Sequence, residues 1–333
     1  MKLIVQIPCF NEEDTIEETL NDIPRDIEGF SEVKTLIIDD GSTDNTVAKA
    51  IDSGVDYIVQ NRQNRGLAKT FNTGIESALM LGADVIVNTD GDNQYQGKYI
   101  KDLVAPIVDK KAEIVIGCRP IEDIDDFSWI KKKLQRLGSY TVSKFAGVNV
   151  EDTTSGFRAY SRKAALSLAV LSSFTYTLET IIQAGRRRMP IVSIPIKTNK
   201  KTRESRLFKS TAQYIFKSFW NILLVSTQVR PIKTFGTIGG VSTFLGVLLG
   251  LRFIILSYFN SGGVFYGEGG YVQSLILSAI LILFGSTSFL VGLVADQISA
   301  NRILLEEIYT QNRAMLFHKN IHDERMGNLI YRK

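Results

Sequence analysis

Short apolar runs alternate with segments of helical periodicity along the first 200 residues. Between most of these runs, apolar residues recur every three or four positions, which predicts helices with one buried face. Strands that alternate with helices favour a largely parallel sheet covered on both faces, so we expect an α/β domain. The apolar runs, rich in Val and Ile as β-strands are, occupy residues 2–8, 33–40, 56–61, 83–90, 112–118 and 190–198.

The pattern is less regular between residues 119 and 189. Residues 119–147 mix acidic and basic blocks, which predicts a loop that leads into a helix. The stretch EDTTSGFRAYSRKAA, residues 151–165, predicts a turn, a short strand and the start of a helix, and residues 176–189 predict another helix. We place one α/β domain at residues 1–205.

Two nearly continuous apolar stretches follow, at residues 234–258 and 271–295. Each is long enough to cross roughly 30 Å of hydrocarbon as a helix. The second has no charged residue, and the first has Arg252 near one end, where a long side chain can reach the interface. We interpret both as transmembrane helices, because two such core helices in a soluble protein would need a much larger core around them.

Charged residues are unevenly placed around the apolar pair. Residues 197–233 hold nine Lys or Arg and one acid, whereas residues 259–270 between the apolar stretches hold no Lys or Arg. This bias predicts an integral membrane protein with the α/β domain and both termini in the cytoplasm. Residues 206–233 mix aromatic, basic and small polar residues, which is typical of interfacial helices on an anionic membrane surface. An ordinary amphipathic helix packed on the domain is the alternative.

Composition excludes several kinds of chemistry. The two histidines, His318 and His322, both lie near the C-terminus, so zinc catalysis of the usual histidine kind is excluded. Neither GxGxxG nor GxxxxGK[ST] occurs, which argues against a dinucleotide fingerprint or a P-loop. We expect Cys9 and Cys118 to be packed thiols, residues 2–8 to be a first strand rather than a signal peptide, and no nucleic-acid partner.

Polar clusters follow three of the predicted strands, at residues 8–13, 39–44 and 89–94. Ligands bind at the carboxyl ends of strands in such sheets, so these clusters should line one crevice. Two carboxylates one residue apart, Asp90 and Asp92, repel each other unless a cation compensates them. With the side-chain carbonyl of Gln94 they offer hard oxygen ligands, which favour magnesium or manganese over zinc. The same residues also suit a plain turn after a strand.

Four strings of residues carry a family resemblance. IPCFNEEDTIEETL, IIDDGSTDNT, NRGLAKTFNTGIESA and VNTDGDNQY, in this order, resemble the family 2 glycosyltransferases of the GT-A fold. With DTTSGFRAYSR and the apolar pair, the chain most resembles the polyprenyl-phosphate sugar transferases, the group that includes dolichol-phosphate mannose synthase. The likeness implies a GT-A nucleotide-diphospho-sugar transferase domain at 1–205, interfacial helices at 206–233, transmembrane helices at 234–258 and 271–295, and a cytoplasmic C-terminal helix or tail at 296–333.

The resemblance also implies a nucleotide-sugar donor and a divalent ion, Mg²⁺ or Mn²⁺. The ion would be held by Asp90, Asp92 and Gln94, while Asp39, nearby, is expected to be structural. Glu13 and Asp44 are assigned to their helix starts, where a carboxylate is favourable. The residues implied in donor binding are Pro8, Phe10, Glu12, Asp40, Gly66, Lys69, Asp90, Asp92 and Gln94.

The implied acceptor is a lipid phosphate, which needs positive charge around it. Glu179 would orient a basic group or a sugar hydroxyl, Asp152 is a candidate base, and Asp92 is counted as catalytic. The family usually has Arg, two variable residues and Gly-Glu-Ser-Lys where this chain has KKTRESR, residues 200–206. Because that departure leaves the phosphate ligand open, we assign Arg203 first. The candidate acceptor-phosphate ligands are Arg119, Lys133, Arg158, Lys200, Arg203 and Arg206.

These residues predict an inverting transferase that moves a hexose from GDP-mannose or UDP-glucose to dolichyl or undecaprenyl phosphate. A processive polysaccharide synthase is one alternative, although the usual Q-x-x-R-W sequence is missing here. An inactive membrane scaffold or flippase partner is another, which the intact pair Asp90 and Asp92 argues against. Residues 296–320 have helical period and could join subunits of a homo-oligomer, or lie on the membrane alone.

Overall fold

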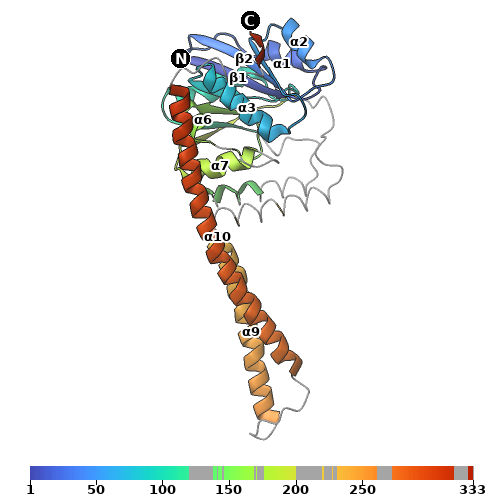
Figure 1. The fold of residues 1–333 in the computed structure, drawn as a ribbon, viewed down its shortest axis with the longest axis vertical. Helices are drawn as coiled ribbons and strands as arrows, with labels where there is room; N and C mark the ends of the chain where they lie inside the picture. The colour runs from blue at the N-terminus through green and yellow to red at the C-terminus, as the bar shows by residue number, and fades with distance from the viewer. Residues whose placement is uncertain are drawn as a thin grey trace. The chain divides into compact units, whose positions relative to one another are not determined.

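The computed structural model of the protein describes two compact units (Figure 1). Met1–Phe219 and Glu306–Lys333 form the first, which we call the sheet unit, and Trp220–Leu305 form the second, the helical unit. Each unit is described here by itself. The described residues are 1–119, 138–140, 142–144, 146–168, 170, 176–199, 220, 227, 231–260, 272–318 and 329–332.

The sheet unit is built on an eight-stranded sheet with the order β7-β5-β6-β4-β1-β2-β3-β8. Its parallel pairs are β4 with β1, β1 with β2, β2 with β3, and β5 with β7, whereas β6 and β8 run antiparallel to their neighbours. This confirms the predicted, mostly parallel α/β sheet and the short strand after residue 151. The strands are β1 Lys2–Cys9, β2 Glu32–Asp39, β3 Tyr57–Gln60, β4 Val85–Asn88, β5 Ile114–Cys118, β6 Arg158–Ser161, β7 Ile191–Pro195 and β8 Leu329–Arg332.

Helices cover both faces of the sheet, as central parallel strands require. One face of β1 packs in a cluster that includes Ile16 from α1 and Leu103 from α4. On the other face lies α3, whose Gly74 approaches Gln6 and Ile38 so closely that an added Cβ would come within 3.0 Å of both side chains. The helices are α1 Ile16–Asp22, α2 Thr46–Asp52, α3 Leu67–Met80, the 3₁₀ turn η1 Gly97–Tyr99, α4 Ile100–Val108, α6 Arg162–Ser167 and α7 Tyr176–Arg186.

The end of α10, Val272–His318, belongs to the sheet unit from Glu306 onward. Arg313 is buried there, and its guanidinium donates to the carbonyl oxygens of Leu168 at 2.8 Å and Ala165 at 3.2 Å, at the end of α6. A cation is favourable at a helix C-terminus. Arg187 donates to Glu307 at 3.2 Å. The sequence predicted a separate tail from residue 296, whereas these contacts make residues 306–333 part of the sheet unit.

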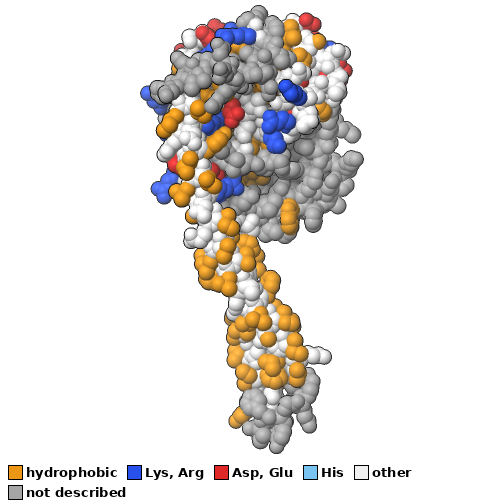
Figure 2. Space-filling model, viewed as in Figure 1, with side chains coloured by type: hydrophobic (Ala, Val, Ile, Leu, Met, Phe, Trp, Pro, Cys, Tyr) orange, Lys and Arg blue, Asp and Glu red, His pale blue; other side chains and the backbone are white. Residues whose placement is uncertain are grey.

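The helical unit contains α9, Pro231–Asn260, and α10 as far as residue 305. Both helices are long and apolar enough to cross a membrane, with mean hydropathies of 2.0 and 2.2. Their apolar side chains are largely exposed (Figure 2), unlike those of a soluble core helix. Small residues let the helices meet: Ser278 Oγ donates to the Gly246 carbonyl at 2.6 Å and Ser242 Oγ to that of Leu281 at 2.9 Å. The two predicted apolar stretches lie within these helices.

Candidate active site

The three predicted polar clusters meet at one edge of the sheet, because β4, β1 and β2 are neighbours that run in the same direction. Hydrogen bonds join the loops that follow them. The Glu12 amide donates to Thr46 Oγ1 at 2.8 Å, and Thr15 Oγ1 donates to the Gly91 carbonyl at 2.7 Å. The expectation of a common site at the strand ends is therefore confirmed for these loops.

Asp40 organises the turn between β3 and α3. Its buried carboxylate accepts hydrogen bonds, all at 2.9 Å, from the side chain of Asn61 and from the amides of Arg65 and Gly66. Gly66 has a φ of 87°, which favours glycine. Neighbouring Asp39 is also buried and accepts from Gln60 at 2.9 Å, in keeping with its expected structural part. Asp40 thus shapes the turn, and a direct contact from it to a nucleoside remains a prediction.

The other residues expected to bind the donor surround this turn. Pro8 is buried at the end of β1, while Phe10 and Glu12 are half-buried in the loop that follows. Lys69 is exposed in the first turn of α3, directly after Gly66. Their placement at the same sheet edge is compatible with a nucleotide site, and their contacts with a nucleotide remain predictions.

Residues 90–96 after β4 form a tight loop, which we call the carboxylate loop. Asn93 adopts a left-handed conformation with a φ of 53°, and the Gln94 amide donates to Asp92 Oδ1 at 3.2 Å. Gly91 packs against Cys9, since an added Cβ would lie 3.0 Å from its sulfur. The turn therefore brings Asp90, Asp92 and Gln94 close together in the chain while it packs on β1.

The electrostatics of the loop favour a cation. Burial raises the pKa of the Cys9 thiol well above its ordinary value, and the carboxylates of Glu12, Asp39 and Asp90 raise it further. Within the described ranges, no three Asp, Glu, His or Cys side chains converge as a metal cage. Two carboxylates and one amide oxygen suit Mg²⁺ or Mn²⁺, which usually completes its shell with water and substrate phosphate. The donor set thus fits the predicted ion.

A buried network behind Asp90 holds its carboxylate in place. The side-chain amide of Asn88 donates to the Gly156 carbonyl at 2.8 Å and to the Tyr176 hydroxyl at 3.0 Å. The Gly156 amide donates to the Tyr95 hydroxyl at 3.2 Å. Sequence reasoning gave no role to these four residues, although Asn88, Tyr95 and Gly156 lie inside the strings that carried the resemblance. The signal was there, but a contact between distant polar residues needs the fold.

We expect Gly156→Ala to weaken metal binding while the protein stays folded. A Cβ at Gly156 would lie 3.1 and 3.2 Å from the two carboxylate oxygens of Asp90 and 2.8 Å from the Tyr176 hydroxyl, so Asp90 must shift. Mn²⁺ affinity, measured by electron paramagnetic resonance on the purified protein, should fall by about tenfold. Gly138→Ala is the matched control, because a Cβ there meets no atom within 4 Å. Equal Mn²⁺ affinities in the two variants would contradict this placement of Asp90.

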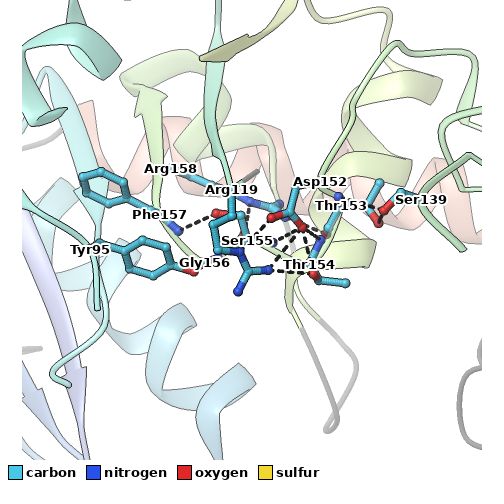
Figure 3. A network of polar contacts seen from close by, with 10 residues as sticks. All are labelled: Tyr95, Arg119, Ser139, Asp152, Thr153, Thr154, Ser155, Gly156, Phe157 and Arg158. Carbon is cyan, nitrogen blue, oxygen red and sulfur yellow. Dashed lines mark hydrogen bonds and ion pairs between the residues drawn. The ribbon is translucent and has the colours of Figure 1, made fainter. Parts of the chain in front are cut away.

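Arg119 and Asp152 form a buried ion pair beside this network (Figure 3). Arg119 Nε donates to Asp152 Oδ2 at 2.8 Å, and Asp152 Oδ1 accepts from the Thr154 hydroxyl at 2.8 Å and the Ser155 amide at 3.1 Å. Burial alone would raise the pKa of Asp152, but the Arg119 charge and these hydrogen bonds hold it below its ordinary value. A carboxylate so engaged is a poor proton acceptor, which disfavours Asp152 as the base and makes it a residue that positions Arg119.

The charge of Arg119 faces the carboxylate loop. Burial lowers its pKa, but Tyr95, Asp152 and Asp90 together raise it above the ordinary arginine value, so the guanidinium stays charged. Its side chain keeps 19% of its surface exposed, whereas Asp152 keeps none. Arg119 can therefore present a fixed positive charge at this site.

Arg158 has a different place from the expected one. Its guanidinium is fully buried and donates to the carbonyl oxygens of Ser155, Thr177 and Thr153 at 2.7, 2.8 and 2.9 Å. It also donates to Thr180 Oγ1 at 2.9 Å. Four of its five N–H groups are thus occupied. The structure therefore corrects the expected acceptor-phosphate contact: Arg158 fastens the turn before β6 to α7.

The remaining candidates are only partly within reach of the structure. Glu179 is half-buried in the first turn of α7, where Gln183 Nε2 donates to its Oε1 at 3.5 Å. The same helix begins at Tyr176, which backs Asp90. The candidates Lys133, Lys200, Arg203 and Arg206 lie outside the described residues, as does most of the expected interfacial stretch 206–233.

Comparison with known proteins decides the family. The profile described as "Glycosyl transferase family 2" matches residues 4–168, which hold the carboxylate loop and its backing network. An uncharacterized protein of Methanocaldococcus jannaschii is 31% identical over 206 residues, which are 59% of this chain and 81% of that protein. The chain belongs to glycosyl transferase family 2. The family predicted from the sequence strings is confirmed.

Two relatives of this glycosyltransferase carry functional names. The UDP-N-acetylglucosamine–dolichyl-phosphate N-acetylglucosaminyltransferase of Methanococcus voltae is 29% identical, with 66% of this chain and 94% of that protein covered. The undecaprenyl-phosphate mannosyltransferase of Micrococcus luteus is 27% identical, with 59% of this chain and 83% of that protein covered. Relatives of this glycosyltransferase thus include enzymes named for different sugars and different polyprenyl phosphates.

Solved structures confirm the GT-A fold. Glucosyl-3-phosphoglycerate synthase from Mycobacterium tuberculosis, in complex with Mn²⁺ and UDP-glucose, superposes with a TM-score of 0.53 at 19% identity. The match covers 66% of this chain and 79% of that one. A second structure of that enzyme contains Mg²⁺ and UDP and superposes with a TM-score of 0.51. At this identity the likeness establishes the fold alone.

Proposed function

We propose that this glycosyltransferase moves a hexose from a nucleotide sugar to a polyprenyl phosphate at a membrane surface. The observation that carries the proposal is the exposed apolar helix pair, α9 and α10, in the same chain as a family 2 site. A transferase with a soluble acceptor has no need of such a pair. The two relatives with functional names support a polyprenyl-phosphate acceptor.

The carboxylate loop would hold the donor through its diphosphate. Asp90, Asp92 and Gln94 would bind Mg²⁺ or Mn²⁺, and the ion, when bound, stabilises the negative charge that develops on the leaving diphosphate. The turn organised by Asp40 and Gly66 would accept the nucleoside. GDP-mannose and UDP-glucose are the donors expected from the sequence, and the name of the M. voltae relative adds UDP-N-acetylglucosamine as a donor to test.

The acceptor would need little help from a base, because the second pKa of a phosphate monoester is about 6. This agrees with an Asp152 that is ion-paired rather than available to accept a proton. Arg119 would place the anionic acceptor next to the donor, and its fork suits a phosphate. One acceptor oxygen would bond to the anomeric carbon as its bond to the diphosphate oxygen breaks, so the configuration inverts.

Both termini are proposed to lie on the cytoplasmic side. The sheet unit holds residues that precede α9 and residues that follow the apolar part of α10, so the chain must return to the side from which it left. Two crossings achieve this return. The excess of Lys and Arg before α9 favours the cytoplasm as that side.

The test is a transfer assay with the purified full-length protein. The protein is incubated with Mn²⁺, dolichyl or undecaprenyl phosphate and, in turn, UDP-glucose, GDP-mannose or UDP-N-acetylglucosamine. We expect a lipid-linked monosaccharide with the anomeric configuration opposite to the donor's, and its loss with EDTA. A growing polysaccharide would favour the synthase alternative. Nucleotide binding without product from any donor would favour the inactive scaffold.

A further inference from the structure

The chain that leaves β7 runs beside the carboxylate loop. The amide of buried Ile196 donates to the Cys118 carbonyl at 3.0 Å, which keeps the chain at the sheet edge. Thr198 then forms an isolated antiparallel bridge with Tyr95. This bridge places the next residue, Asn199, against the loop that carries Asp92 and Gln94.

Asn199 contacts the loop through its backbone and both ends of its side-chain amide. Its backbone N–H donates to the Gln94 carbonyl at 2.9 Å, and its Nδ2 donates to the Asn93 carbonyl at 2.9 Å. Its Oδ1 accepts from Gln96 Nε2 at 2.8 Å. One asparagine thus binds three of the four residues that follow Asp92.

These bonds fix the direction of the Gln94 side chain. The peptide group before the Gln94 Cα carries the Asn93 carbonyl, and the peptide group after it carries the Gln94 carbonyl, and Asn199 binds both. With both flanking peptide planes held, the Cα–Cβ bond has one direction. The bond to Asn93 also supports the left-handed conformation of that residue, which is uncommon without glycine.

We infer that Asn199 is a positioning residue that aims Gln94 at the ion and holds the carboxylate loop in its binding shape. The inference rests on the proposed function only in taking residues 90–94 as an ion site. Asn199 is followed in the sequence by residues 200–206, which hold four Lys or Arg. The same anchor therefore joins the start of that basic stretch to the loop that would hold the donor diphosphate.

The test compares Mn²⁺ binding by full-length variants, without turnover. Asn199→Asp keeps the size and the acceptor for Gln96 but sets a carboxylate oxygen against the Asn93 carbonyl. Residues that support metal ligands cost about 10- to 100-fold in affinity when changed. We expect Asn199→Asp and Asn199→Ala to weaken Mn²⁺ binding by about tenfold, with unchanged thermal midpoints. Asn21→Asp, on the exposed surface of α1, is the matched control and should bind Mn²⁺ as the wild type does.

A double-variant cycle separates this role from a general loss of structure. If Asn199 acts through the loop, Gln96→Ala combined with Asn199→Ala should bind Mn²⁺ more tightly than the product of the two single effects predicts. Wild-type affinity in both Asn199 variants would overturn the inference, as would a loss that merely follows a lowered thermal midpoint. Wild-type protein that fails to bind Mn²⁺ would overturn it together with the ion site. Normal Mn²⁺ binding without sugar transfer would overturn the proposed function alone.

Discussion

Asp92→Asn should abolish sugar transfer while the protein remains folded. The amide has nearly the shape of the carboxylate but carries no charge, so it binds a divalent ion weakly and leaves the charge on the departing diphosphate uncompensated. Loss of one well-placed electrostatic stabiliser costs about 100- to 1,000-fold in rate. We expect a loss at the upper end of that range, measured as the initial rate of lipid-linked product formation with saturating Mn²⁺.

A surface carboxylate gives the matched control. Asp102 is exposed in the first turn of α4, so Asp102→Asn removes the same charge from the same unit away from the loop. Its rate should stay within twofold of the wild type, an expectation that follows from the small effect of exposed charges. A fully active Asp92→Asn variant would refute the ion role of the loop. An equal drop in both variants would mean that net charge, rather than Asp92, controls the rate.

The fold and the edge that carries the site could be predicted from the sequence because both depend on local pattern. Apolar runs located the strands, and the rule that parallel strands present their carboxyl ends together placed Asp40 and Asp90 at one edge. The exposed apolar helices were predictable for the same reason, since lipid-facing helices need continuous apolar sequence.

The roles of individual polar residues could not be predicted, because they depend on contacts between distant parts of the chain. Arg158 and Arg119 both lie in charged, motif-like strings, and the sequence offered no means of telling them apart. The structure separates them by burial: carbonyl oxygens occupy Arg158, whereas Arg119 stays partly exposed. Asn199 gave no signal at all, since a lone asparagine after a strand suits any turn.

The ion pair of Arg119 and Asp152 makes separable contributions to stability and to catalysis. In Arg119→Gln the Asp152 carboxylate remains buried without its cation, which should lower the free energy of unfolding by about 3 kcal/mol. The double variant Arg119→Gln with Asp152→Asn has no buried charge and keeps an acceptor oxygen for Thr154 and Ser155. It should recover most of the thermal midpoint but little activity, because the proposed phosphate ligand is missing. Recovery of both would show that Arg119 is structural only.

The pH dependence of unfolding tests the same pair independently. The folded protein lowers the pKa of Asp152, so the stabilisation from its charge is complete above the unfolded pKa of about 3.9. It is lost as the pH falls through the lower pKa of the folded state. Asp152→Asn cannot titrate at this position, so the difference in thermal midpoint between wild type and this variant should narrow below about pH 4. A difference that is the same at pH 3 and pH 7 would mean that Asp152 is not held ionised by Arg119, and the guanidinium would then lack the fixed position from which it is proposed to bind the acceptor phosphate.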